Sequence, residues 1–306
     1  ELEENRNITI NLREIVKHMP KKAHPMDVAR TVVSVMGLED KDTRNNSPAA
    51  NMRKAIRIFA KTPTAIAAFF RARKGKNVIL PKKSLGFSEN FFYMCFGEIP
   101  NKEIVKAFDV SLILYAEHSF NVSTFTARTI TSSLSDIHSA ITGAIGSLKG
   151  PLHGGANEEV MHMMNKIKKP ENALKWINKA LDNKDVVMGF GHRVYKKGDS
   201  RVPTMEKYFR KVSKVKKDKK LYKIYDLVKN VMIERKNIHP NVDYPTGPTY
   251  HLMGFDTDFF TPIFVLSRIT GWSAHIMEQH AANKLIRPLS KYSGEQHRKV
   301  MLLNQR

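Results

Sequence analysis

Cysteine is nearly absent from this sequence and long apolar runs are missing, and each absence excludes a class of protein. The single cysteine, Cys95, excludes a framework of intramolecular disulfides and favours a reducing, intracellular compartment. The most apolar stretch, 259–272, is interrupted by Pro262 and Arg268 and falls short of the roughly 20 residues of a membrane span. The first residues have no apolar segment typical of a signal peptide. We therefore expect a cytoplasmic protein, or one of the mitochondrial matrix in a eukaryote, with no membrane partner.

Acidic residues are scarce, because 29 Asp and Glu stand against 51 Lys and Arg, a formal net charge of +22. The segment 207–223 alone holds nine basic residues and a single acidic one, Asp218. Such a segment can bind nucleic acid or a membrane, or it can be a solvated helix face. We favour the solvated face and predict no nucleic-acid partner. A basic surface also suits polyanionic small molecules such as a nucleotide-bearing cofactor.

Apolar residues recur at helical spacing along most of the chain. Across 104–118 they return at steps of three and four residues, as on a buried helix face. The same period predicts helices over 123–134, 172–181 and 221–233. Thr261 followed by Pro262 is a typical N-cap and first turn, and candidate strands are confined to 78–80 and 186–188. With no internal repeat or long linker, the pattern predicts an all-α fold.

Four segments place a histidine or a carboxylate among residues that expose it. The four candidates are His118, His153, His192 and Asp243. The last three fall in the breaks rich in glycine and proline, at 143–156, 189–203 and 240–248. Loops on a rigid scaffold are where catalytic residues usually lie. These four widely spaced segments therefore predict an active site assembled from distant loops.

His153 and Asp243 have the clearest chemical settings. His153 is bracketed by Pro151 and two glycines, just before a helix expected from Ala156. The positive end of that helix disfavours imidazolium, so a neutral His153 can donate a hydrogen bond to a carbonyl oxygen. Asp243 has apolar neighbours, and partial burial raises the pKa of a carboxylate toward that of a useful base. The alternatives are a histidine that caps a turn and an aspartate in an Asx-turn.

A cluster of cations surrounds the third histidine. His192 is followed by Arg193, Lys196, Lys197 and Arg201, a set that suits carboxylates and phosphates. The Gly-x-Gly that precedes His192 lacks the third glycine and the βαβ context of a dinucleotide fingerprint. A basic surface loop is the alternative interpretation.

Arg268 and His118 lie in apolar helices, where structural roles compete with substrate binding. Arg268 lies in an otherwise apolar helix, and a buried arginine needs an anionic partner, either ligand or protein. His118 ends an apolar helix and could equally be a core histidine. The histidines include no close pair of the His-x-x-x-His kind, so we expect no metal.

The quoted segments resemble the citrate synthase family over nearly the whole chain. The matching text comprises 112–118 with 121–128, 146–158, 188–196, 267–268 with 271–272, and 286–290. Within the family, 198–205 and 244–248 are most similar to the 2-methylcitrate synthases. The resemblance implies condensation of propionyl-CoA with oxaloacetate and hydrolysis of the thioester, as in the methylcitrate cycle of propionate catabolism. Use of acetyl-CoA, as in tricarboxylic acid metabolism, is the near alternative, and a basic nucleic-acid-binding helical protein is the remote one.

The resemblance also implies an architecture. It predicts a large helical domain from 1–153 and 246–306, whose N-terminal part is expected to be missing, and a smaller mobile domain from 154–245. It further implies a homodimer in which Arg287 crosses the interface. No permanently bound cofactor is expected, since the coenzyme A thioester is a co-substrate.

Roles for single residues follow from the same resemblance. Asp243 would remove the α-proton of the thioester, His153 would donate to the thioester oxygen, and His192 would polarise the ketone of oxaloacetate. Oxaloacetate would be held by His118, Arg201, Arg268 and the partner subunit's Arg287. Coenzyme A would lie along Val186, Val187, Met188, Gly189, Phe190 and Gly191, with Arg193, Lys196 and Lys197 near its phosphates.

Overall fold

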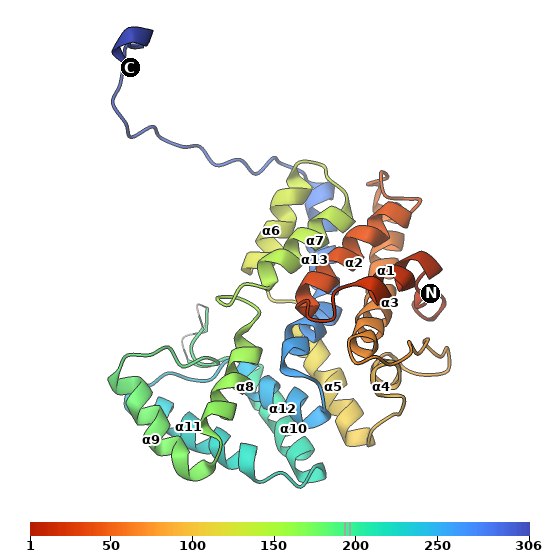
Figure 1. Ribbon diagram of the computed structural model, residues 1–306, viewed down its shortest axis with the longest axis vertical. Helices are drawn as coiled ribbons and strands as arrows, with labels where there is room; N and C mark the ends of the chain where they lie inside the picture. Colours follow the sequence, from red (N-terminus) through yellow and green to blue (C-terminus); the bar gives the residue numbers. More distant parts are fainter. Residues whose placement is uncertain (193, 196) are drawn as a thin grey trace.

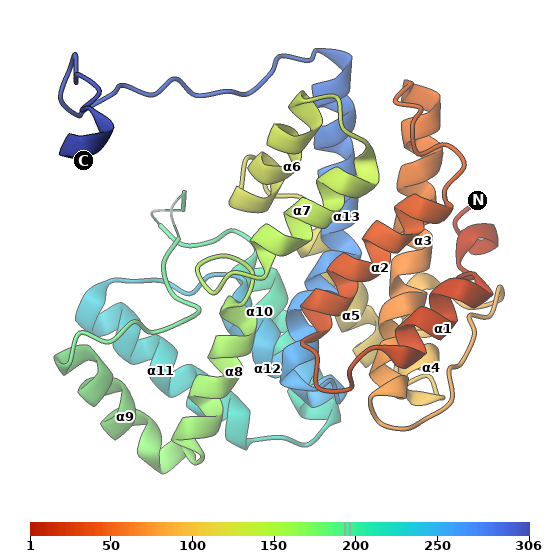
Figure 2. The same cartoon turned by 45° about the horizontal axis from the view of Figure 1, so that its top comes forward.

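The computed structural model describes residues 1–192, 194–195 and 197–306, and helices make up nearly all of its regular structure (Figures 1 and 2). In these residues the α-helices are α1 (Ile10–His18), α2 (Pro25–Glu39), α3 (Pro48–Ala72), α4 (Phe87–Phe96), α5 (Lys102–Tyr115), α6 (Val122–Ser132), α7 (Ile137–Leu148), α8 (Ala156–Ile167), α9 (Pro170–Asp182), α10 (Val202–Val215), α11 (Lys220–Lys236), α12 (Asp243–Met253) and α13 (Phe260–Ala281). Three short 3₁₀ turns are η1 (Glu3–Asn5), η2 (Thr257–Phe259) and η3 (Leu303–Gln305). The all-α prediction is confirmed.

The prediction of strands at 78–80 and 186–188 is wrong. No strand forms in the described residues, where the nearest approach to one is an isolated antiparallel bridge between Phe190 and Pro240. Each apolar triplet is too short for a strand without a partner. The second triplet also runs into Gly189, whose φ of 85° turns the chain out of the extended conformation.

Several helix ends differ from the sequence pattern. α5 ends at Tyr115, so His118 lies in the following loop rather than in the helix. α13 begins at Phe260 directly after η2, so Thr261 is already helical and is not the N-cap. Tertiary contacts extend or shorten such ends beyond what local residues indicate.

Helix α13 forms the centre of the larger group of helices, where it packs against α3, α5, α6 and α7 (Figure 2). Its Trp272 and Arg268 are among the largest fully buried side chains. Gly271 permits this packing, because a Cβ there would lie 2.5 Å from the carbonyl oxygen of Ala116. The Gly271 N–H donates to that same oxygen at 3.2 Å. The loop that carries His118 is thereby held against α13.

Helices α8 to α12 lie together on the other side of the molecule (Figure 1). α12 packs on α8 and α10, and Gly247 lets it approach α8 closely. A Cβ at Gly247 would lie 2.6 Å from the carbonyl oxygen of Asn157. This contact fixes the start of α12, where Asp243 lies, relative to the turn that carries His153. The domain boundaries at 153 and 245 stay a prediction.

After Asn283 and Ile286, which are hydrogen-bonded to Ser132 of α6, the C-terminal residues leave the body of the protein as an extended segment that ends in η3 (Figures 1 and 2). Its apolar side chains, among them Leu285, Leu289 and Tyr292, are exposed. Within the described residues, no helix combines the length and the apolar character that a bilayer crossing requires.

Candidate active site

The C-terminal end of α5 is the point where distant segments meet. Arg268 of α13 donates from Nε to the carbonyl oxygen of Tyr115 at 2.7 Å, and Arg201 donates from Nη1 to that of Leu114 at 3.4 Å. The Tyr115 hydroxyl donates to Oδ1 of Asp243 at 2.6 Å. The last carbonyls of a helix carry partial negative charge, which favours cations there. Two predicted arginines and the predicted base are thus brought together.

Asp243 is the first residue of α12 and not, as expected, part of a loop. Burial raises the pKa of its carboxyl to about 6, although the Tyr115 hydroxyl and the nearby positive charge of Arg201 act to lower it. A carboxylate with such a pKa is mostly ionised at neutral pH and is a stronger base than an exposed aspartate. Tyr115 was not singled out from the sequence, because its partner lies 128 residues away.

Replacing Tyr115 with phenylalanine should raise the pKa of Asp243 further, since it removes a hydrogen bond that stabilises the ionised form. One charge-assisted hydrogen bond is worth enough to shift a pKa by about one pH unit. Below the pKa the base is protonated and inactive, so the acidic limb of kcat/KM should move to higher pH by that amount. The measurement is a pH–rate profile of both proteins, and an unmoved limb would contradict the assignment.

The hydrogen bonds of His153 fix its tautomer. Its Nε2 accepts from the backbone N–H of Ser123 at 3.2 Å and lies 2.9 Å from the Ser123 hydroxyl, which accepts from Trp272 Nε1 at 3.1 Å. A backbone N–H can only donate, so Nε2 carries no proton and Nδ1 does. Burial, and then the positive charge of Arg268, lower the pKa of His153 to about 4.

His153 is therefore a neutral donor through Nδ1. The start of α8 was expected to keep His153 neutral, but α8 begins three residues later, at Ala156. Burial and the charge of Arg268 are instead what lower the pKa of His153. Ser123 and Trp272, which orient the ring, were missed from the sequence. The only local signal was a hydroxyl residue close to the Asn121 N-cap of α6.

His192 and His118 lie beside one another, with ring centroids 5.0 Å apart. His192 Nδ1 accepts from the backbone N–H groups of Val194 at 3.0 Å and Tyr195 at 3.3 Å, which leaves its proton on Nε2. Nε2 of His118 lies 3.1 Å from the hydroxyl of Tyr195. Burial lowers the pKa of both rings, that of His118 to about 4, so both are neutral at physiological pH.

The arginines differ in how their charge is balanced. Arg201 forms a two-pronged ion pair with Asp199, through Nε to Oδ1 at 3.0 Å and Nη2 to Oδ2 at 2.8 Å. Arg268 is 2% exposed and lies over the ring of Phe264, but it forms no ion pair with any described residue. Burial, and then the charge of Arg201, lower the pKa of Arg268 to about 10, so it stays charged. Arg287 is exposed in the C-terminal segment.

The predicted coenzyme A segment, 186–191, is attached to the residues that precede Asp243. The Gly191 N–H donates to the carbonyl oxygen of His239 at 2.8 Å, and the Asn241 N–H donates to that of Gly189 at 2.9 Å. Both glycines adopt positive φ, at 85° and 78°, which only glycine adopts readily. Asn241 also donates from its side chain to the carbonyl oxygen of Gly191 at 3.0 Å.

A cavity of about 160 Å³ lies beside this segment. It is lined by Gly191, His192, Tyr195, Gly198, Asp199, Asn237, Ile238, His239 and Pro240. Arg193 and Lys196, two of the three predicted phosphate contacts, lie outside the described residues. The cavity therefore joins one predicted catalytic residue to the predicted coenzyme A segment.

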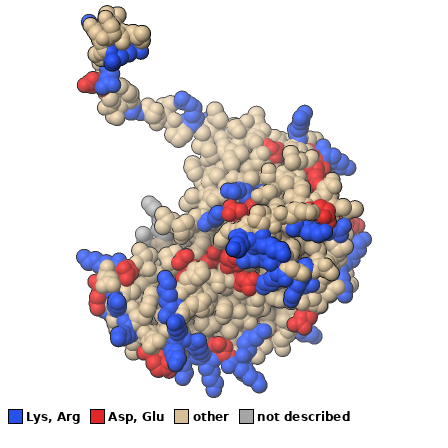
Figure 3. Space-filling view, in the orientation of Figure 1, with Lys and Arg blue, Asp and Glu red and all other residues tan. Residues whose placement is uncertain are grey.

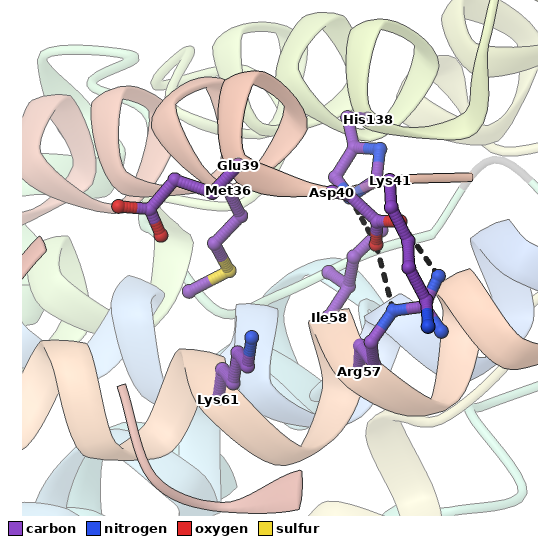
Figure 4. Close-up of a pocket in the computed structure, with 8 residues that line it drawn as sticks. All are labelled: Met36, Glu39, Asp40, Lys41, Arg57, Ile58, Lys61 and His138. Carbon is purple, nitrogen blue, oxygen red and sulfur yellow. Dashed lines mark hydrogen bonds and ion pairs between the residues drawn. The ribbon is translucent and has the colours of Figure 1, made fainter. Parts of the chain in front are cut away.

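A second cavity, of about 190 Å³, lies between α2, α3 and α7 and holds none of the predicted residues (Figure 4). Arg57 donates to both carboxylate oxygens of Asp40, at 2.7 Å and 2.6 Å, and His138 lies 3.6 Å from the same carboxylate. The ion pair joins α3 to the end of α2, and His138 of α7 packs beside it, which argues for a structural role. In the described part of the chain, no three His, Cys, Asp or Glu residues are arranged to hold a metal ion.

The chain is similar to known proteins in both sequence and structure. The family model described as "Citrate synthase, C-terminal domain" matches residues 1–289. The chain is 50% identical to a citrate synthase of Mycolicibacterium smegmatis, over 97% of this chain and 79% of that one. It is 52% identical to a 2-methylcitrate synthase of Mycobacterium tuberculosis, over 96% of this chain and 74% of that one. It also superposes, with a TM-score of 0.92 and 31% identity, on the citrate synthase of Thermoplasma acidophilum in a ternary complex with carboxymethyl coenzyme A and oxaloacetate, covering 100% of this chain and 82% of that one.

Proposed function

Because the chain belongs to the citrate synthase family and is an enzyme of that type, we propose that it condenses propionyl-CoA with oxaloacetate and releases 2-methylcitrate and CoA. The observation that carries this proposal is the group formed by Asp243, His153, His192 and Arg268. It combines one carboxylate base, two neutral N–H donors and one buried positive charge without a carboxylate partner. Deprotonation beside a carbonyl, followed by attack on a ketone, requires this combination.

In the first step, Asp243 removes the α-proton of the acyl thioester. His153 donates from Nδ1 to the thioester oxygen as negative charge develops there. A neutral donor is suited to this role, because its hydrogen bond strengthens as the oxygen becomes an enolate. The backbone N–H of Ser123, whose hydroxyl accepts from Trp272 Nε1, holds the ring in the required tautomer.

In the second step, the enol carbon attacks the ketone of oxaloacetate. His192 donates from Nε2 to the ketone oxygen and takes up part of the developing charge. The new carbon–carbon bond yields a citryl-type thioester, which water then hydrolyses to the free acid and CoA. The hydrolysis makes the overall reaction effectively irreversible.

Oxaloacetate carries two carboxylates, and the arginines match them. Arg268 lacks a carboxylate partner and is suited to bind one of the two directly. Arg201 keeps Nη1 outside its ion pair with Asp199, and His118 lies beside His192. The partner subunit's Arg287 would complete the set.

The thioester would enter along Val186 to Gly191, through the cavity beside His192. Arg193, Lys196 and Lys197 would meet its phosphates. The proposed domains, 1–153 with 246–306 and 154–245, contribute different members of the site. Their closure over oxaloacetate would bring the members together and exclude water from the enol.

The choice of thioester is tested by steady-state kinetics. We expect CoA release that depends on oxaloacetate, with kcat/KM higher for propionyl-CoA than for acetyl-CoA. The ratio should be modest, because one methylene in an apolar pocket is worth about 1–3 kcal/mol. A strong preference for acetyl-CoA would overturn the methylcitrate assignment, and no CoA release from either thioester would overturn the function.

We also propose that the enzyme is a homodimer, and exposed apolar surface supports this. Ile113, Phe120, Val122 and Phe125 are exposed on and beside α5 and α6, and the C-terminal segment adds further apolar side chains. Exposed apolar side chains of this size usually mark an interface where they gather on one face. The buried, unpaired Cys95 supports a reducing compartment, which we propose is the cytoplasm.

A subunit-mixing experiment tests whether Arg287 acts across the interface. Chains carrying Asp243→Asn and chains carrying Arg287→Gln are co-expressed with different tags, and the heterodimer is purified. If Arg287 acts in the partner's site, one of the two sites is intact and activity recovers to about half of wild type. If Arg287 acts within its own chain, both sites stay defective and activity stays at background.

The remote alternative, a nucleic-acid-binding protein, has less support. Figure 3 shows Lys and Arg over several parts of one face with Asp and Glu among them, rather than gathered in one stripe. Nucleic-acid binding would weaken steeply with salt and would be unaffected by Asp243→Asn.

A further inference from the structure

Asp199 is a fully buried carboxylate that joins two parts of the proposed site. It lies three residues before the start of α10, after Gly198, whose φ of 107° turns the chain. Its Oδ1 accepts from the backbone N–H and from Nε of Arg201, both at 3.0 Å. Its Oδ2 accepts from Nη2 of Arg201 at 2.8 Å and from the backbone N–H of Val242 at 3.0 Å. All four hydrogen bonds come from two residues that flank the site.

The bonds to Arg201 set the direction of its guanidinium. They occupy Nε and Nη2, and they leave Nη1 with a single long contact, 3.4 Å to the carbonyl oxygen of Leu114. A guanidinium held on one edge has far less rotamer freedom than a free one, so its other edge is oriented before a ligand arrives. The available edge is the one at the end of α5, where Asp243 and Arg268 also lie.

The bond to Val242 acts on the proposed base. Val242 is the N-cap of α12 and immediately precedes Asp243. Its own N–H has no acceptor within α12, and the carboxylate of Asp199 accepts from it, as the side chain of the third helical residue does in a capping box. The position of the Asp243 carboxylate therefore depends on a residue 44 positions earlier in the chain.

We propose that Asp199 is a positioning residue that aligns Arg201 for a substrate carboxylate and Asp243 for proton abstraction through one buried carboxylate. The proposal rests on the roles given to Arg201 and Asp243 in the proposed function. Asp199 itself does not touch the substrate. Its negative charge also offsets Arg201, which otherwise would stand uncompensated beside Arg268.

Asp199→Asn tests this, with Asp182→Asn as the matched control, because Asp182 is a 65% exposed carboxylate on the neighbouring helix α9. The side-chain amide of asparagine places its own N–H groups against N–H donors of Arg201 or Val242, so hydrogen bonds to one side of the group are lost. The substitution also removes the negative charge of Asp199. We expect KM for oxaloacetate to rise about 10- to 100-fold, as for other small misplacements of substrate-binding groups, with little change in KM for propionyl-CoA. The acidic limb of kcat/KM should also move to lower pH, because the charge of Asp199 raises the pKa of Asp243. The control should match wild type.

A purely structural role predicts a different result. Both KM values would then change together, or the loss would appear only in thermal stability, and an unmoved acidic limb would overturn the proposal. A double-mutant cycle with Arg201→Gln, read out as oxaloacetate binding by calorimetry, adds a second criterion. If Asp199 acts through Arg201, its effect on binding largely disappears in the Arg201→Gln background.

CoA release by the wild-type enzyme and a second variant, Asp199→Glu, distinguish a failure of the proposed function from a failure of the role given to Asp199. If wild type releases no CoA from either thioester, the proposed function fails, whatever Asp199 does. If Asp199→Asn does not fold, Asp199→Glu keeps the charge and displaces it. This variant should raise KM for oxaloacetate while leaving the acidic limb in place, and an unchanged KM would overturn the positioning role.

Discussion

Replacing Asp243 with asparagine should lower kcat by about 10²- to 10⁴-fold, the usual contribution of a positioned general base. The amide is nearly the same size and can still accept from the Tyr115 hydroxyl, but it cannot take the α-proton. The fold should be preserved, because Asp243 forms no ion pair in the described structure. The expected result is thus a loss of rate without a loss of stability.

The measurement combines steady-state kinetics with the exchange of α-protons of propionyl-CoA for solvent deuterium. Both should fall together, and the circular dichroism melting curve should match that of wild type. In the wild-type enzyme, activity should fall below about pH 6, where Asp243 becomes protonated. A variant that keeps a tenth or more of the wild-type kcat would show that another group is the base.

Replacing Arg268 with methionine should have opposite effects on binding and on stability. Arg268 is buried without a carboxylate partner, and a buried uncompensated charge is costly. Methionine has a similar length and no charge, so its lower desolvation cost should outweigh the lost hydrogen bond to the carbonyl oxygen of Tyr115, and the free energy of unfolding without substrate should rise by about 1 kcal/mol. The affinity for oxaloacetate should fall about 10²-fold or more, because a buried charge-assisted pair is lost.

Arg201→Met is the informative comparison for Arg268→Met. It also removes a proposed oxaloacetate ligand, but it leaves the buried carboxylate of Asp199 without its partner. The free energy of unfolding should therefore fall, by about 3 kcal/mol. Chemical denaturation and calorimetry with oxaloacetate measure both quantities. A destabilised Arg268→Met would contradict the assignment of Arg268 as an uncompensated charge.

The residues that could be found from the sequence are those with an unusual local setting. His153, His192 and Asp243 stand beside glycine or proline, and Arg268 interrupts an apolar helix. The helical period over 104–118 likewise came from local spacing, although the helix ends at Tyr115. Local patterns of this kind predicted the all-α fold.

The residues that were missed act through partners far along the chain. Tyr115 meets Asp243 across 128 residues, Trp272 meets Ser123 across 149, and Asp199 meets Val242 across 43. None has a local feature that sets it apart from an ordinary core residue. The two false strands have the opposite origin, because β-branched residues there have the local preference for strands but no neighbouring segment with which to pair.

The bond from Trp272 to Ser123 has an optical consequence. The chain has two tryptophans, and the indole of Trp272 is fully buried, two hydrogen bonds from the ring nitrogen of His153. Indole emission responds to the hydrogen bonding of its N–H. A Trp176→Phe enzyme would therefore have Trp272 as its one tryptophan, and its emission should change without any added label when a bound substrate alters the hydrogen bonds of His153 and Ser123.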